Sequence, residues 1–133
     1  MSLTVTPDVL EAAEAGRLSD EAFVACVQES LPYAYGVVER LARRLPAAVA
    51  AGASCVVDDT VPPDDAAFGQ LLRAFASTSI RGALERRFGV ALAFQNCHRV
   101  GAFSPGGRAG DAYRRFTSPE SQIRNQRPDL VNC

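Results

Sequence analysis

The feature that most constrains the fold is a regular stripe of apolar residues in the first half of the chain. Its members recur every three or four residues: Val24, Val27, Leu31, Ala34, Val38, Leu41 and Leu45. This spacing places all of them on one face of an α-helix, which therefore needs an apolar partner. Pro32 lies inside the stripe and lacks the N–H that a helix interior uses. We therefore expect the helix to be kinked or split near Ser30 and Leu31.

Start and stop signals flank this stripe. Thr6 followed by Pro7 predicts a short helix, which Gly16 ends. Ser19 is the expected N-cap of the stripe helix. Pro46 is expected to weaken or end that helix, with at most one further turn before Gly52.

The next segments predict another helix and a little β-structure. A helix from Asp64 or Asp65 is expected to be interrupted at residues 77–79 and to stop at Gly89. Bulky and small residues then alternate over 90–95, the period of a strand, and residues 99–103 are its expected hairpin partner. Residues 55–57 are a possible short strand. Shorter helical turns are expected to begin at Asp111 and Ser118.

These elements predict a mainly α fold, a helical bundle with a small β-hairpin near 90–103, and the alternative is a two-layer α+β domain. The chain has 133 residues, of which 47% are apolar and 22% charged, so we expect one domain spanning residues 1–133. The N-terminus lacks the pattern of a signal peptide, and no apolar run approaches the roughly 20 residues of a membrane span. The expectation is a cytoplasmic protein with no membrane contact. All basic residues are arginine, which suggests a bacterial, GC-rich source.

Charge is divided along the chain. Residues 1–65 contain eleven Asp and Glu and four Arg, which gives a net charge of −7. Residues 66–133 contain four Asp and Glu and ten Arg, which gives a net charge of +6. The near-cancellation favours an acidic half that folds against a basic half, or one subunit that meets another. A basic face kept for an anionic partner is the other interpretation.

The cysteines do not predict a metal site. Cys26, Cys55, Cys97 and Cys133 form no CxxC element, and only one histidine is present. The expectation is therefore no metal and no cofactor. With no secretion signal, all four thiols are expected to be reduced.

Cys97, His98 and Arg99 form the most reactive-looking local motif. A thiol beside a base and a permanent cation acquires a lower pKa and becomes a nucleophile. Adjacent residues of a strand point to opposite faces, so Cys97 and His98 would meet only in a turn. The simpler interpretation is a buried cysteine, a loop histidine and a surface arginine.

Arginine pairs supply the candidate ligand-binding residues, which are Arg86, Arg87, Arg99, Arg114 and Arg115, with Tyr113 beside the last pair. Guanidinium groups bind phosphate and carboxylate in a bidentate manner. A small anionic ligand is therefore possible. Nucleic acid is an unlikely partner, because no nucleic-acid motif is present and the sequence pI is about 5.8.

Two functions of different class follow. The first is a non-enzymatic regulatory or assembly protein that self-associates, or binds a protein partner, through complementary acidic and basic surfaces. The alternative is a small thiol-dependent enzyme or anionic-ligand-binding domain that uses Cys97, His98 and Arg99. The sequence leaves open whether the protein is an enzyme.

Overall fold

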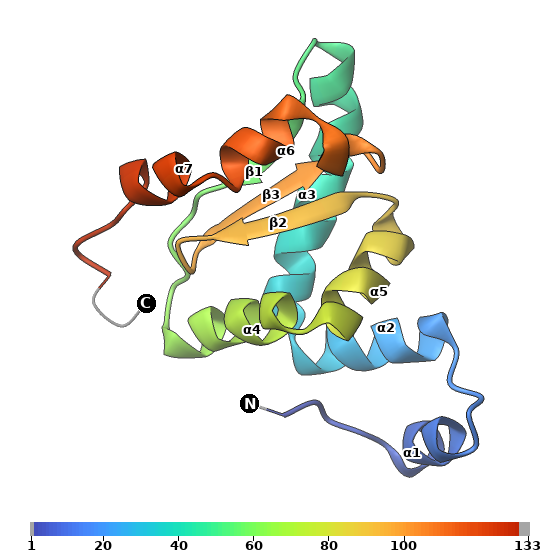
Figure 1. Ribbon diagram of the computed structural model, residues 1–133. Helices are drawn as coiled ribbons and strands as arrows, with labels where there is room; N and C mark the ends of the chain where they lie inside the picture. Colours follow the sequence, from blue (N-terminus) through green and yellow to red (C-terminus); the bar gives the residue numbers. More distant parts are fainter. Residues whose placement is uncertain (1, 131–133) are drawn as a thin grey trace.

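The computed structural model describes residues 2–130, and it confirms a mainly helical chain with a small antiparallel sheet (Figure 1). In chain order the elements are α1 (Pro7–Glu14), α2 (Asp20–Ser30), α3 (Pro32–Ala50), β1 (Cys55–Asp58), α4 (Asp65–Ala76), α5 (Thr78–Phe88), β2 (Ala91–Gln95), β3 (Arg99–Phe103), the 3₁₀ turn η1 (Gly107–Ala109), α6 (Asp111–Phe116) and α7 (Pro119–Arg124). No described helix is both long enough and apolar enough to cross a membrane. Cys133 lies outside the described residues.

The apolar stripe forms the centre of the core. All seven of its residues are buried, and they come from α2, from Leu31 at the junction and from α3. The expected break falls at Leu31, whose backbone leaves the helical region at φ −128° and ψ 58°. Pro32 then opens α3 at the first helical position, where the missing N–H costs nothing.

Pro46 does not end the helix at its own position, and the further turn expected before Gly52 is present. The helix α3 continues through Pro46 to Ala50. Pro46 is exposed, and its N–H would have bonded the carbonyl of Ala42 one turn earlier. That carbonyl can turn toward water on the exposed side of the helix, which makes the lost bond tolerable.

The other helix boundaries follow their local signals. Thr6 and Ser19 each accept a bond from a backbone N–H in the first turn of their helices. Ser77 separates α4 from α5 and caps α5 through the N–H of Ile80. Gly89 ends α5 in the left-handed region at φ 64°, which glycine adopts without strain.

The predicted hairpin is present, and a third strand joins it. The strand β3 pairs with β2 through Gln95 opposite Arg99, and with β1 through Asp58 opposite Val100. The sheet order is therefore β1-β3-β2, with every pair antiparallel. The short strand expected at residues 55–57 is confirmed, and it places the end of β1 beside the start of β3.

Helices cover both faces of this sheet (Figure 1). One face packs against the core of α2–α5 and presents Val56, Leu92, Val100 and Ala102. The opposite face carries a smaller cluster in which Phe103 packs with Phe116 of α6. We call these the inner and the outer face. The candidate site lies at the outer face, where α7 follows α6.

Candidate anion-binding site

Three arginines from separate segments line one pocket at the edge of the outer face. They are Arg99 at the start of β3, Arg115 of α6 and Arg124 of α7. The pocket has a volume of about 500 Å³, and its other lining residues are Phe116, Ser118, Glu120, Ser121 and Asn125. The lining therefore carries three positive charges and one negative charge.

Arg99 is held in place by contacts with three other side chains. Its Nη1 donates to Gln95 Oε1 at 3.0 Å, and its guanidinium carbon lies 5.0 Å from the ring centroid of Phe116. Its Nε lies 3.2 Å from Asp59 Oδ1, close enough for an ion pair but without hydrogen-bond geometry. The side chain is only 13% exposed. A guanidinium has five N–H donors, so donors remain to face the pocket.

Gln95 ties the sheet to α7 beneath the pocket. Its buried side chain accepts bonds from Arg99 and, at 3.0 Å, from Ser121 Oγ. Ser118 caps α7 through the N–H of Ser121 and donates to the carbonyl of Arg115. Asn125 donates to the carbonyl of Ser121 at 2.8 Å. These polar side chains use their bonds within the scaffold, so the arginines remain as the donors for a ligand.

His98 lies next to this pocket but does not line it. The residue is 2% exposed. Its Nδ1 is 2.6 Å from the carbonyl oxygen of Asn96, and its Nε2 is 3.1 Å from Asp59 Oδ1. A carbonyl only accepts, so Nδ1 is the donor to Asn96, and Nε2 faces the Asp59 carboxylate. Both ring nitrogens are thus engaged, and His98 fastens the segment after β1 to the β2–β3 turn.

One acidic side chain, Asp59, contacts two of the three residues in the predicted Cys97, His98 and Arg99 motif. The same oxygen, Oδ1, contacts both His98 and Arg99. Its carboxylate is 64% exposed and comes from the loop after β1, forty residues earlier in the chain. Sequence reasoning missed this residue, because only the pairing of β1 with β3 brings it close.

Cys97 occupies the β2–β3 turn, where Asn96 and Cys97 both have positive φ, 56° and 52°. This conformation is typical of tight hairpin turns. Cys26 and Cys55 are free thiols, whereas Cys97 is disulfide-bonded, contrary to the expectation that it is reduced. Sequence spacing does not show which cysteines the fold brings within bonding distance. A disulfide sulfur is not a thiolate, so nucleophilic chemistry at Cys97 would first require reduction.

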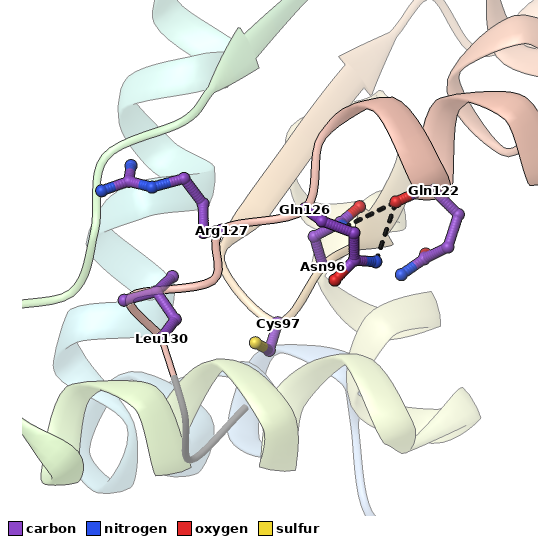
Figure 2. Close-up of a pocket in the computed structure, with 6 residues that line it drawn as sticks. All are labelled: Asn96, Cys97, Gln122, Gln126, Arg127 and Leu130. Carbon is purple, nitrogen blue, oxygen red and sulfur yellow. Dashed lines mark hydrogen bonds between the residues drawn. The ribbon is translucent and has the colours of Figure 1, made fainter.

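A second, smaller pocket of about 180 Å³ surrounds this turn (Figure 2). Its lining comes from the turn, from α7 and from the segment after α7, and consists of Asn96, Cys97, Gln122, Gln126, Arg127 and Leu130. The amides of Asn96 and Gln126 both donate to the carbonyl of Gln122, at 3.0 and 2.9 Å. Arg127 pairs with Asp129, which lowers the pKa of that carboxyl through a side-chain hydrogen bond. These contacts hold the chain after α7 against the hairpin.

The remaining predicted site residues lie elsewhere. Arg86 of α5 pairs with Asp20 of α2 at 2.6 Å, and Arg87 packs over the ring of Phe88. Arg114 is on α6 but pairs with Asp111, and Tyr113 packs edge-on against Phe103. Of the six predicted ligand residues, the structure therefore brings together only Arg99 and Arg115 in this pocket. Arg124 was not among the predicted site residues, because it is not adjacent to another arginine in the sequence.

Only a few ion pairs within the molecule join the acidic half of the chain to the basic half. Among the described residues, contacts from Asp20 to Arg86 and from Asp59 to His98 and Arg99 join the acidic half to the basic half. The other ion pairs stay within one half: Glu39–Arg43, Glu85–Arg108, Asp111–Arg114 and Arg127–Asp129. The acidic residues of α1 make no ion pair with another described residue.

The structure defines a mainly α protein with a three-stranded antiparallel sheet between helices and a basic pocket on its outer face. The whole chain, residues 1–133, matches a family model that bears the label KH NucS shadow and is described as "NucS shadow ORF". The chain belongs to this family. The description names an open reading frame and states no activity. No curated protein and no solved structure matches the chain.

Proposed function

We propose that this is a non-enzymatic assembly protein that self-associates head to tail, the acidic N-terminal arm of one copy binding the basic face of another. The acidic arm is residues 5–18, which include α1. The basic face is made by Arg115, Ile123 and Arg124 on α6 and α7. The observation that carries the proposal is that α1 contributes no buried residue to its own molecule.

The arm has the composition of a surface that binds another surface. It is fixed at Thr4, whose N–H donates to Ser30 Oγ and whose carbonyl accepts from Cys26 Sγ. Beyond that point, Val5 and Leu10 are each 50% exposed. They lie among Asp8, Glu11 and Glu14. Exposed apolar side chains rimmed by charge are typical of interaction sites.

The basic face offers the matching chemistry. Ile123 is 71% exposed on the same short helix as Arg124, and Arg115 is exposed on the neighbouring helix. In Figure 1, α1 and α7 lie on opposite sides of the molecule, so the arm does not reach the basic face of its own chain. A contact of this kind between copies is heterologous, and it produces either a closed ring or an open chain. Its small area supports a weak, salt-sensitive association.

The test is sedimentation velocity over a wide range of concentration at about 20 mM and about 500 mM salt, where the Debye lengths are roughly 20 Å and 4 Å. We expect association that grows with concentration and weakens at high salt. Reversing the charge of the acidic arm with Glu11→Arg and Glu14→Arg should weaken self-association about tenfold. The control Glu29→Arg, at an exposed acid on α2, should change self-association little. Mixing the arm variant with an Arg115→Glu, Arg124→Glu variant should restore association. A monomer under every condition would refute the proposal.

The thiol-dependent enzyme has less support. His98 is buried with both ring nitrogens engaged, and Cys97 is disulfide-bonded. The two residues are neighbours in a turn, but the histidine is not available as a base for the sulfur. The anion-binding part of that alternative is developed in the next subsection.

One other candidate is binding of single-stranded nucleic acid, raised by the Gly-x-x-Gly sequence at residues 107–110. KH modules clamp the nucleic-acid backbone with a Gly-x-x-Gly loop. Gly107-Arg108-Ala109-Gly110 has this spacing, but Arg108 is paired with Glu85, and a Cβ on Gly107 would come within 2.9 Å of Phe103 Cβ. The glycines thus have a packing role. Anisotropy of a labelled single-stranded oligonucleotide tests this candidate, and Arg108→Gln should abolish binding if the loop is a clamp.

A further inference from the structure

The geometry points to a ligand for the basic face: the pocket of Arg99, Arg115 and Arg124, two of which the proposed self-association also uses, binds the phosphate group of a small, non-aromatic phosphate monoester. Three guanidinium groups from β3, α6 and α7 converge on one volume. Guanidinium groups match the oxygens of phosphate with paired N–H donors. The lining carries three arginines and one acid, Glu120, so its net charge is positive by two. This charge matches the two negative charges of a phosphate monoester better than the single charge of a carboxylate.

The pocket is prepared for a ligand by its scaffold. Arg99 is positioned by Gln95, by Asp59 and by the ring of Phe116, so one of the three cations loses little side-chain freedom when a ligand binds. Arg115 and Arg124 are exposed and form the outer wall. The hydroxyls of Ser118 and Ser121 are already used within the scaffold, so recognition rests on the arginines.

Size and shape indicate which ligand carries the phosphate. A volume of about 500 Å³ is within the range of small-molecule sites, so there is room for a body beyond the phosphate itself. Among the described lining residues, no aromatic face is open to stack a nucleobase. Phe116 is buried, with Arg99 over its ring and Phe103 against it at 5.9 Å between ring centroids. Tyr113, nearby on α6, packs on Phe103 as well. Base recognition by stacking, which nucleotide and nucleic-acid sites use, has no platform here.

The experiment is isothermal titration calorimetry of the full chain with glycerol 3-phosphate, inorganic phosphate, AMP and acetate. To keep the outcome separate from self-association, it is repeated in the Glu11→Arg, Glu14→Arg background. We expect saturable binding of glycerol 3-phosphate in both backgrounds, with acetate at least tenfold weaker and AMP no tighter than glycerol 3-phosphate.

Matched arginine variants locate the site. Arg115→Gln with Arg124→Gln removes two exposed cations from the pocket and should weaken glycerol 3-phosphate binding by at least tenfold. The control Arg40→Gln with Arg44→Gln removes two exposed cations outside the pocket and outside the acidic arm, and it should leave binding unchanged. The proposal is overturned if both double variants bind equally, if acetate binds as well as the phosphate ligands, or if AMP binds much more tightly.

Discussion

The two faces of the sheet use the same three strands but support different parts of the molecule. The inner face presents aliphatic side chains such as Leu92 and Val100 to the core of α2–α5, and both are fully buried. The centre of the outer face presents small residues, Ala91, Ala93 and Gly101, beside the large ring of Phe103. The small residues leave room for α6 to approach closely. Stability is therefore expected to reside mainly in the inner face, and the arginine pocket in the outer one.

The strongest test of this comparison is a cavity on the inner face. Leu92→Ala removes most of a side chain that has no exposed surface, so it should lower the free energy of unfolding by about 3 kcal/mol. Urea unfolding followed by circular dichroism measures the change. The control is Leu72→Ala on α4, where the side chain is 45% exposed and the loss should stay below about 1 kcal/mol. Equal losses at the two positions would contradict an inner face that dominates stability.

A smaller effect is expected from filling space on the outer face. A Cβ on Gly101 would lie 3.0 Å from Phe103 Cε1 and 3.2 Å from Phe116 Cε2, so two packed rings must move. Gly101→Ala should therefore cost about 2 kcal/mol, and it should also alter the pocket through Phe116. Gly106→Ala is the matched control, since a Cβ there would have nothing within 4 Å and the backbone φ is −85°. Thermal unfolding of the two variants decides whether the outer face is tightly packed.

The smallest effect is expected from the exposed ion pair that joins α2 to α5 within the inner helical layer. The side-chain hydrogen bond from Arg86 lowers the pKa of Asp20 below its ordinary value of 3.8. Because the folded-state pKa is depressed, the stabilisation is present above pH 3.8 and is lost as pH falls through the folded value. Asp20→Asn should therefore reduce the difference in stability between pH 6 and pH 2 slightly. Asp65→Asn, at an exposed acid of α4 that makes no ion pair with another described residue, serves as control. An identical pH dependence in the two variants would show that the pair contributes nothing.

Local signals accounted for most element boundaries. Thr6, Ser19, Ser77 and Gly89 act at the ends of the helices where the sequence placed them, because caps depend only on neighbouring backbone groups. Pro46 left two outcomes open, a weakened or an ended helix, for the complementary reason. Its effect depends on whether the unbonded carbonyl faces water or the core, and the sequence does not record this.

The site was harder to predict than the fold. Cys97, His98 and Arg99 were chosen as neighbours in sequence, but the fold gives them different environments. Cys97 is disulfide-bonded in a turn, the ring of His98 is buried, and Arg99 lines the pocket. Asp59 and Arg124, which complete the surroundings of Arg99, were not among the predicted site residues. Asp59 belongs to an acidic loop and Arg124 lies near Arg127, but neither pattern points to Arg99, which is far away in the chain.

The sequence alone determined the helical periodicity, the break at Pro32, the hairpin and the division of charge, because each depends on residues near one another in the chain. Only the tertiary structure decided that β1 pairs with β3 and that α6 and α7 fold onto the outer face. Those contacts join segments separated by tens of residues, and their free energy comes from packing and ion pairs that no local pattern encodes. The arginine pocket is a product of those long-range contacts.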